Sequence, residues 1–202
     1  MPYTQRIPKP LLTVHGISLL ERNINALYGS GIREIVINTS WLGSQIQDFV
    51  TQLDLLELRI SCVHEGEIPL GTGGGIFNAL NHLQDEPFWV INADIITSYP
   101  FAPIILTENS LAHLVLVSNP DHNESGDFGL DGDQVLNESI QMHTFSGISC
   151  LSPDIFQGVN QPIFSLASLL RKFIGLGLVK GELFLGKWLD VGTIERLNKA
   201  DG

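Results

Sequence analysis

Hydrophobic residues along the first part of the chain gather in short runs of strand length. These runs are rich in β-branched and aromatic side chains and show little polar alternation, as is typical of strands buried on both faces of a sheet. They cover residues 33–38 (REIVIN), 58–63 (LRISCV), 87–93 (PFWVINA) and 112–117 (AHLVLV). We therefore expect strands at these positions in a mainly parallel sheet.

Segments with helical spacing of apolar residues lie between these runs. Residues 17–31 carry such a pattern and close with Gly29 and Gly31, typical helix stop signals. Residues 40–53 open on Ser40, a residue type that often caps a helix. A third helical segment, 74–83, follows a run of glycines. Strands that alternate with helices predict a series of βαβ units.

The second half of the chain continues the α/β pattern. Residues 125–136 read as an exposed hairpin, residues 165–178 as a helix, and residues 181–193 as a strand that ends in a turn. With 202 residues, no internal repeat and no linker composition, the sequence predicts a single domain, 1–202.

Composition and charge narrow the classes of function. The formal net charge is −11 and the eleven Lys and Arg residues are scattered, which argues against nucleic acid as a partner. The longest apolar stretches are too short to cross a bilayer and no secretion signal is recognisable, so we expect a cytoplasmic protein that does not bind membranes. Cys62 and Cys150 lie far apart, outside any Cys-x-x-Cys motif, and are interpreted as buried thiols.

A run of four glycines in five positions, residues 71–75, is the most unusual local feature. The G-x-G-x-x-G dinucleotide spacing fails because Ile76 and Asn78 stand where the third glycine is needed, and no Walker A motif is present. A bare-backbone loop before a helix can expose N–H groups to a planar or anionic ligand. A mobile loop with tight packing explains the same residues, and the sequence leaves both interpretations open.

Two aspartates stand where apolar strands are expected to end. Asp94 follows the run 87–93, and Asp190 precedes Thr193, a residue suited to cap a helix. Open α/β sheets bind ligands at the carboxyl ends of their strands. Mg²⁺ takes one or two protein carboxylates and completes its shell with water and phosphate oxygens, so the pair suits phosphate chemistry. Each aspartate alone is equally explained as a strand-end cap or a turn residue.

Five motifs follow one another along the chain: PKPLL (8–12), LGTGGGI (70–76), NAD (92–94), FSGI (145–148) and WLDVGT (188–193). In this order and at these spacings they resemble the motifs of the sugar-1-phosphate nucleotidyltransferases. The segments EIVIN...WLG, EGE and GDF resemble in particular the short bacterial N-acetylmuramate-1-phosphate uridylyltransferases within that superfamily. The resemblance implies a Rossmann-like nucleotide-diphospho-sugar transferase fold, with a mixed, mainly parallel sheet and helices on both faces.

This resemblance also implies a reaction and its cofactor. The oxygen of a sugar 1-phosphate would attack the α-phosphorus of a nucleoside triphosphate, UTP in this group, and pyrophosphate would leave. Lys9 would contact nucleotide phosphate, and Asp94 and Asp190 would hold a catalytic Mg²⁺, so that these three residues form the catalytic set. The product would serve nucleotide-sugar biosynthesis in cell-wall and peptidoglycan recycling. A mannose- or heptose-1-phosphate guanylyltransferase is the alternative within the same superfamily.

The remaining assignments concern the two organic substrates. By resemblance, Gly71, Thr72 and Gly73 would line the nucleobase, because glycine lets a flat ring lie against bare backbone. The segments that hold the hexose in the family contain four substrate-binding candidates: Asn119, Asp127, Gly147 and Glu182.

One departure from the family pattern concerns the N-terminus. Family members begin with an apolar strand and a G-x-G-x-R loop around the triphosphate, whereas here Met1 stands seven residues before Pro8. The resemblance therefore implies a domain whose first strand is missing, and a chain that folds but turns over poorly because the phosphate cradle is absent. A catalytically inactive nucleotide-sugar binding module is the second function class that we consider.

Overall fold

The computed structural model describes residues 6–66, 68–102 and 106–201, and in it the chain forms two compact units. The first unit comprises Met1–Pro69, Ala93–Ala102 and Leu189–Gly202. The second comprises Leu70–Asn92 and Pro103–Trp188. Both units are therefore assembled from segments that are separate in sequence. The prediction of a single domain over 1–202 stays a prediction.

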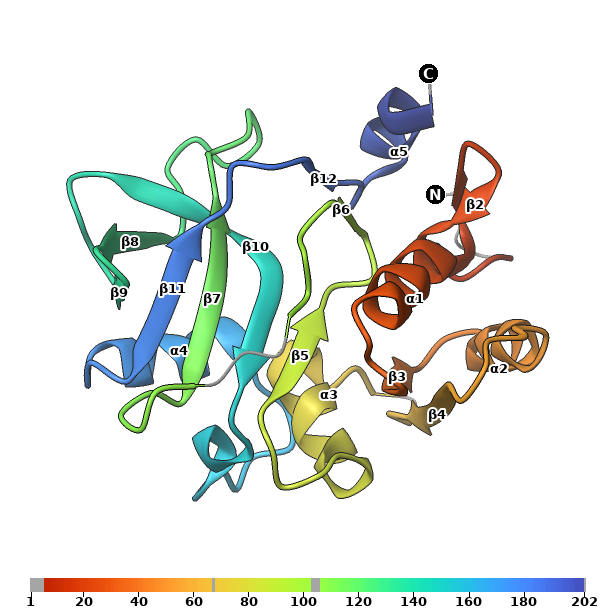
Figure 1. The fold of residues 1–202 in the computed structure, drawn as a ribbon, viewed down its shortest axis with the longest axis horizontal. Helices are drawn as coiled ribbons and strands as arrows, with labels where there is room; N and C mark the ends of the chain where they lie inside the picture. Colours follow the sequence, from red (N-terminus) through yellow and green to blue (C-terminus); the bar gives the residue numbers. More distant parts are fainter. Residues whose placement is uncertain (1–5, 67, 103–105, 202) are drawn as a thin grey trace. The chain divides into compact units, whose positions relative to one another are not determined.

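The first unit contains three pairs of strands and most of the helices of the N-terminal third (Figure 1). β3 and β4 pair in parallel, as the sequence predicted, whereas β1 and β2 form an antiparallel ribbon and β6 pairs with β12. The elements are η1 (Lys9–Leu11), β1 (Thr13–Val14), β2 (Ile17–Ser18), α1 (Leu19–Gly29), β3 (Glu34–Thr39), α2 (Gly43–Thr51), β4 (Arg59–His64), β6 (Ile95–Thr97), β12 (Trp188–Asp190) and α5 (Ile194–Asp201).

The ends of α1 and α2 follow different rules. α1 is capped by Ser18, whose Oγ accepts a hydrogen bond from the N–H of Glu21 at 3.1 Å, and it ends at the predicted Gly29. The prediction that Ser40 caps α2 is wrong, because the helix begins three residues later at Gly43. Leu42 before it adopts a left-handed φ of 58°, and a Cβ on Gly43 would lie 2.9 Å from the Cβ of Thr39. The chain therefore turns sharply against the end of β3 before α2 can start.

The second unit is built on a six-stranded sheet in the order β5-β10-β7-β11-β9-β8. Only β7 and β11 pair in parallel in the described part of this sheet, and the other pairs are antiparallel. The α/β class with a mixed sheet is confirmed, but the share of parallel pairing is smaller than the sequence predicted. The strands are β5 (Phe88–Ile91), β7 (Ala112–Val117), β8 (Phe128–Asp131), β9 (Gln134–Leu136), β10 (Met142–Leu151) and β11 (Val179–Leu183).

The strand β10 accounts for the larger share of antiparallel pairing. It is the longest strand in the described part of the chain. It pairs antiparallel with β5, β7 and β8, which places it inside the sheet. Its register against β7 shifts between Phe145 and Ile148, so the strand carries a bulge around Gly147. The Ser- and Gly-containing sequence of β10 lacks the continuous apolar character of the other buried strands, and for this reason it was not predicted.

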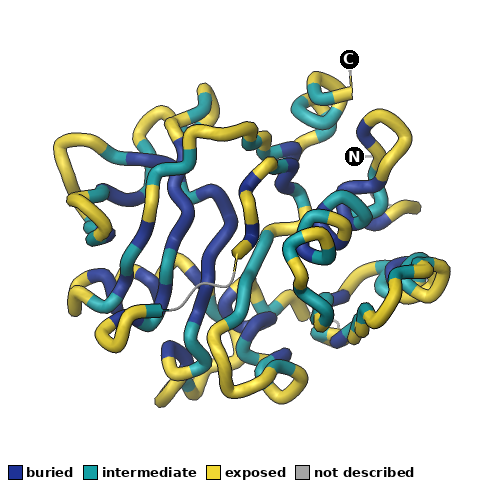
Figure 2. Tube along the Cα trace, in the orientation of Figure 1, coloured by how far each residue is buried: buried dark blue, intermediate teal, exposed yellow. Residues whose placement is uncertain are grey.

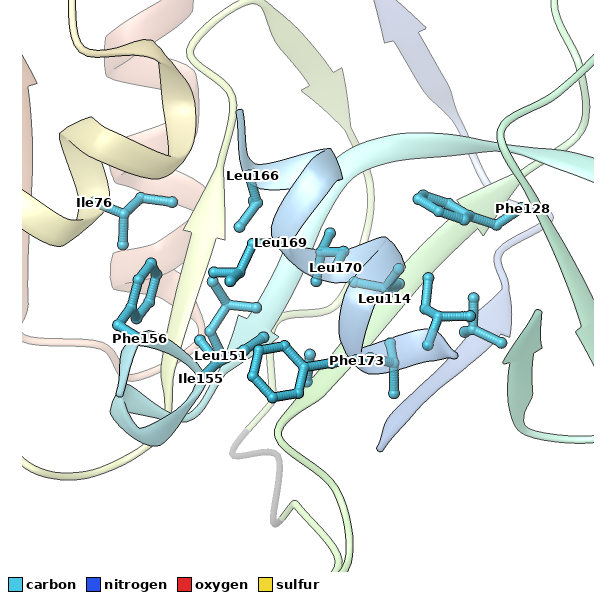
Figure 3. Close-up of a cluster of buried hydrophobic side chains, with 14 of the residues drawn as sticks. Ile76, Leu114, Phe128, Leu151, Ile155, Phe156, Leu166, Leu169, Leu170 and Phe173 are labelled. Carbon is cyan, nitrogen blue, oxygen red and sulfur yellow. The ribbon is translucent and has the colours of Figure 1, made fainter. Parts of the chain in front are cut away.

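The main core of the second unit lies between one face of this sheet and its helices. Figure 2 shows the buried positions running along β7 and β10, and Figure 3 shows α4 laying its apolar side chains toward Leu114 and Leu151. Ile76 of α3 and Phe156 of η3 extend the same cluster. The helical elements are α3 (Gly71–Ala79), η2 (Leu80–His82), η3 (Pro153–Phe156) and α4 (Leu166–Ile174).

The first unit has smaller clusters of its own. Leu20 and Ile24 of α1 pack with Ile46 of α2 against the apolar side of the β3–β4 pair. Val14, Leu19, Ile96 and Val191 form a second cluster with partly buried residues of α5. None of the helices in the described ranges combines the length and the apolar composition that a membrane crossing requires.

Candidate active site

The two predicted aspartates come together in the first unit. Asp94 lies in the turn before β6, and Asp190 is the last residue of β12. The pairing of these two strands is extended by a hydrogen bond from the N–H of Val191 to the carbonyl oxygen of Asp94 at 2.9 Å. Residues almost a hundred positions apart in sequence are thereby held on neighbouring turns.

Gly192 lies between the two carboxylates. A Cβ added to it would stand 2.6 Å from Oδ1 of Asp190 and 3.4 Å from Oδ2 of Asp94. Its N–H donates to Oδ1 of Asp190 at 2.6 Å, which fixes the direction of that carboxylate. A side chain at position 192 would occupy the space that the ends of the Asp190 and Arg196 side chains now fill, so both would have to move away from the backbone.

Lys9 completes the predicted catalytic set. Its Nζ donates to Oδ2 of Asp94 at 2.5 Å, and the exposed fractions of the two side chains are 34% and 29%. The lysine is held in the short helix η1, which follows Pro8 and closes with a hydrogen bond from the N–H of Leu12 to the carbonyl oxygen of Lys9. The structure thus brings together Lys9, Asp94 and Asp190, as the sequence predicted, while their catalytic roles stay predictions.

Arg196 belongs to the same cluster and was not predicted. Its Nη2 donates to Oδ1 of Asp190 at 3.2 Å, and both side chains are about three-quarters buried, with exposed fractions of 28% and 24%. The hydroxyl of Thr193, the expected helix cap, accepts a hydrogen bond from the N–H of Arg196 at 3.2 Å. The i,i+6 separation of Asp190 and Arg196 has no regular meaning in a strand or a helix, so the sequence carried no signal for this contact.

The donor set is suited to a magnesium ion bound together with phosphate. Within residues 6–66, 68–102 and 106–201, no group of three or more His, Cys, Asp or Glu side chains is placed to hold a metal. Mg²⁺ requires fewer protein ligands than three, because it takes one or two carboxylates and receives its other oxygens from water and substrate phosphates. Two carboxylates that are less than a third exposed, placed around a bare glycine and flanked by the cations Lys9 and Arg196, fit that requirement.

The glycine run has a different setting from the one predicted. The helix α3 begins at Gly71 itself, so the glycines form its first turns and the predicted helix start at residue 74 is wrong. A Cβ on Gly73 would stand 2.5 Å from the ring of Phe164, and a Cβ on Gly74 would stand 2.2 Å from the carbonyl oxygen of Pro162. The segment around residue 164 therefore lies directly against the helix backbone.

This packing divides the glycines into two groups. Gly73 and Gly74 are buried, and the close approach of the segment 162–166 is sufficient reason for their lack of a side chain. Gly71 and Thr72 are exposed at the start of α3. Gly71 adopts a left-handed φ of 72°, and a Cβ on it would stand 2.8 Å from the carbonyl oxygen of Phe164. Tight packing therefore explains Gly73 and Gly74, and backbone conformation and packing together explain Gly71. The assignment of Gly71, Thr72 and Gly73 to the nucleobase stays a prediction.

Two of the predicted sugar-binding residues are engaged in hydrogen bonds within the second unit. Asn119 donates from Nδ2 to the carbonyl oxygens of Glu124 and Met142, at 3.0 and 3.1 Å, and its Oδ1 accepts from the hydroxyl of Thr144 at 3.0 Å. In the same loop, Oδ2 of Asp127 accepts from the N–H of Phe145 at 2.8 Å. These bonds fasten the loop 118–127 to β10.

The other two candidates lie elsewhere in this unit. Gly147 sits in the β10 bulge with φ 79°, and a Cβ there would stand 2.7 Å from Nδ2 of Asn92. Glu182 is on β11, where its Oε1 lies 3.2 Å from Nε2 of His113 on the parallel neighbour β7. The structure joins Asn119 and Asp127 through one network and places Glu182 beside a histidine instead. Substrate binding by all four stays a prediction.

Neither cysteine belongs to the charged cluster around Gly192. Burial raises the pKa of the Cys150 thiol to about 12, and it also raises the pKa of Cys62, which is only half-buried. Both are free thiols.

Comparison with known proteins decides the family. The profile of the family described as nucleotidyl transferase matches residues 1–134. The chain belongs to this family. It is 38% identical over 208 residues to N-acetylmuramate alpha-1-phosphate uridylyltransferase of Neisseria meningitidis serogroup B, covering 98% of this chain and 90% of that protein. It is also 34% identical to a probable mannose-1-phosphate guanylyltransferase of Oryza sativa, covering 95% of this chain and 57% of that protein.

Solved structures of nucleotidyltransferases share the fold. HddC from Yersinia pseudotuberculosis, in complex with GMP-PN, superimposes with a TM-score of 0.77 at 25% identity, covering 96% of this chain and 88% of HddC. A putative glucose-1-phosphate thymidylyltransferase from Bacillus anthracis reaches a TM-score of 0.79 at 17% identity, covering 99% and 87% of the two chains. The predictions of a nucleotide-diphospho-sugar transferase fold and of a sugar-1-phosphate nucleotidyltransferase are confirmed. Nucleotidyltransferases of this family generally use a divalent metal.

Proposed function

We propose that this nucleotidyltransferase makes a UDP-sugar from UTP and N-acetylmuramate 1-phosphate, with release of pyrophosphate. The similarity to the Neisseria uridylyltransferase supports this choice, because it extends over almost the whole chain and 90% of that protein. The product would enter peptidoglycan recycling, which takes place in the cytoplasm. The partners are thus a nucleoside triphosphate and a sugar 1-phosphate.

The cluster around Gly192 supplies the charge that this reaction needs. Asp94 and Asp190 would hold Mg²⁺, which when bound neutralises the triphosphate and makes the pyrophosphate a better leaving group. Lys9 is held against Asp94 and would orient the same phosphates by charge. No nucleophile from the protein is required, since the sugar phosphate itself attacks. Catalysis then consists of positioning and charge stabilisation.

The single observation that carries the proposal is the convergence of Asp94 and Asp190 on one bare glycine, with Lys9 bonded to Asp94. Each of these residues belongs to a different motif, and the motifs are separated by more than eighty positions. Unrelated strand-end caps would have no reason to converge in this way.

The choice of base and sugar has a competitor with its own support. The rice relative is named a guanylyltransferase, and HddC is bound to the guanine nucleotide analogue GMP-PN. A guanylyltransferase acting on mannose or heptose 1-phosphate would use the same cluster of charges. An inactive nucleotide-sugar binding module would keep the fold and bind the product without making it.

A pyrophosphate-release assay with Mg²⁺ separates these functions. UTP and GTP are each paired with N-acetylmuramate 1-phosphate and with mannose 1-phosphate, and Asp190→Asn serves as the negative control. Release that depends on UTP and N-acetylmuramate 1-phosphate supports the proposal, whereas release with GTP and mannose 1-phosphate favours the competitor. Binding of UDP-N-acetylmuramate by calorimetry, without release from any pair, would identify a binding module.

A further inference from the structure

Each carboxylate of the Gly192 cluster is matched with its own cation. Asp94 accepts a hydrogen bond from Lys9 at 2.5 Å, and Asp190 accepts one from Arg196 at 3.2 Å. All four side chains are between about a quarter and a third exposed, so solvent screens these pairs less than it screens ion pairs on an open surface. The four formal charges cancel around Gly192.

We propose that Lys9 and Arg196 act as internal counter-ions that couple metal binding to polyphosphate binding. The proposal rests on the function proposed above. A divalent ion that enters alone meets two carboxylates already neutralised and two nearby positive charges that repel it. When a polyphosphate enters with the ion, Lys9 and Arg196 exchange carboxylate oxygens for phosphate oxygens, and no cation is left without a partner.

Arg196 is built for such an exchange. Its Nε is buried and has no hydrogen-bond partner within the described residues, although one of its Nη atoms is engaged with Asp190. The guanidinium therefore keeps donor capacity that its present contacts do not use, and a planar fork of donors matches phosphate oxygens. Since Arg196 stands in the first turn of α5, its backbone is fixed by Thr193 while its side chain reorients.

The bare backbone of Gly192 gives the exchange its room. A Cβ there would stand 2.6 Å from Nη2 of Arg196 and equally close to Oδ1 of Asp190. Both groups can therefore shift across the glycine without meeting a side chain. Arg196 is thus a positioning residue that keeps Asp190 neutralised until the substrate arrives.

The test measures binding of Mn²⁺ by electron paramagnetic resonance, with and without pyrophosphate, and requires no turnover. In the unchanged protein, Mn²⁺ alone should bind weakly and pyrophosphate should tighten it at least about tenfold. In Arg196→Met, Mn²⁺ alone should bind roughly tenfold more tightly because a nearby positive charge is gone, and the coupling to pyrophosphate should fall to about twofold. Lys9→Met should act in the same direction.

Four further variants separate charge exchange from simpler explanations. Arg196→Lys keeps the charge and should retain most of the coupling. Lys199→Met removes a charge from an exposed position of the same helix, where Lys199 pairs with Glu195, and should leave Mn²⁺ binding unchanged. Arg196→Gln provides a second neutral variant should Arg196→Met fail to fold, as judged by circular dichroism. Asp190→Asn should lose Mn²⁺ binding in both conditions.

Mn²⁺ binding that is unchanged or weaker in both neutral variants would overturn the proposal, since Arg196 would then only orient Asp190. Equal Mn²⁺ affinity with and without pyrophosphate in the unchanged protein would overturn it as well. Absence of Mn²⁺ binding under every condition would overturn it together with the assignment of the metal to Asp94 and Asp190. The nucleotide and sugar specificity would still be decided by pyrophosphate release, so the two failures remain distinguishable.

Discussion

The predicted site residues of the two units differ in what their polar atoms do. In the first unit, Lys9, Asp94 and Asp190 bring charges from three distant motifs together, and both carboxylates lie close to Gly192. In the second unit, Asn119 and Asp127 use their polar atoms to fasten a loop to β10. The first arrangement balances its charges with two ion pairs on partly exposed side chains that a ligand can still reach, whereas the second uses its polar atoms within the fold.

Glycines show the same contrast. Gly192 is bare because two carboxylates and a guanidinium approach it, whereas Gly73 and Gly74 are bare because a neighbouring stretch of protein lies on them. A glycine-rich motif therefore indicates close approach without revealing whether a ligand or the chain itself approaches. The atoms around the missing Cβ decide between the two.

The largest expected effect follows from removing one charge of the Gly192 cluster. Asp190→Asn should lower turnover by about 10²–10³-fold or more, because a preorganised charge-stabilising group is lost. The thermal unfolding midpoint should stay close to that of the unchanged protein, since the amide oxygen of the new side chain still accepts the hydrogen bond from the N–H of Gly192. Pyrophosphate release and circular dichroism melting check the two expectations. A variant with full activity would remove Asp190 from the catalytic set.

A methyl group added inside the glycine run should lower the unfolding free energy. Gly74→Ala places a Cβ 2.2 Å from the carbonyl oxygen of Pro162, and such overpacking typically costs about 1–3 kcal/mol of unfolding free energy. Gly175→Ala is the matched control in the same unit, because its Cβ would meet atoms no closer than 3.5 Å. Urea denaturation measures both. Equal stability of the two variants would contradict the packing that we describe.

Gly73→Val tests whether position 73 lacks a side chain because the protein packs against it or because a nucleobase binds there. The nucleobase assignment predicts loss of nucleotide binding, and the ring of Phe164 at 2.5 Å from the added Cβ predicts loss of stability as well. Gly73→Val combined with Phe164→Ala should recover much of the stability by making space. Calorimetric titration of UTP into this double variant then isolates the role of the base site. Nucleotide affinity equal to that of Phe164→Ala alone would leave Gly73 with a packing role only.

The network in the second unit should respond as a structural element. Asp127→Ala removes the acceptor for the N–H of Phe145 and for Nδ2 of Asn123, and we expect a loss of about 1–3 kcal/mol in unfolding free energy. Asn123→Ala should cost less. The double variant should lose less unfolding free energy than the sum of the two single losses, because Asn123 and Asp127 share one hydrogen bond. Strict additivity in urea denaturation would show that the residues act independently.

The smallest effect concerns the two thiols, one in each unit. At pH 8 in the folded protein, Cys150 should not react with a disulfide reagent, and Cys62 should react more slowly than a free thiol, since burial raises both pKa values. Above about pH 9 the unfolded chain releases the Cys150 proton and the folded chain keeps it, so stability should fall as pH rises toward 12. Thiol titration with and without urea measures the first expectation. Rapid labelling of both cysteines in the folded protein would contradict it.

The sequence predicted the elements whose pattern is local. The strands β3, β4, β5 and β7 lie within a residue or two of their expected ranges, because short runs rich in β-branched and aromatic residues favour strands. Of the four, only β7 is largely buried, as the apolar runs predicted. The proximity of Lys9, Asp94 and Asp190 was also predictable, since each stands in a motif that resembles one of the nucleotidyltransferase family, whereas Arg196 stands in none. What escaped prediction depends on tertiary contacts. The strand character of β10 and the packing of Pro162 on Gly74 depend on partners far along the chain. The contact of Arg196 with Asp190 spans only six residues, but it follows neither strand nor helix periodicity.

The position of β10 also has a consequence for the newborn chain. β5 is the apolar segment Phe88–Ile91, and its partner within the described strands is the last part of β10, Ile148–Leu151. During synthesis, roughly sixty residues must leave the ribosome after β5 before this partner exists, which at about 5–20 residues per second is an interval of several seconds. An unpaired, strongly apolar strand is a template for association with other chains during that time. The ribosome-bound nascent chain should therefore be most prone to aggregate, and most dependent on chaperones, between the emergence of β5 and that of β10.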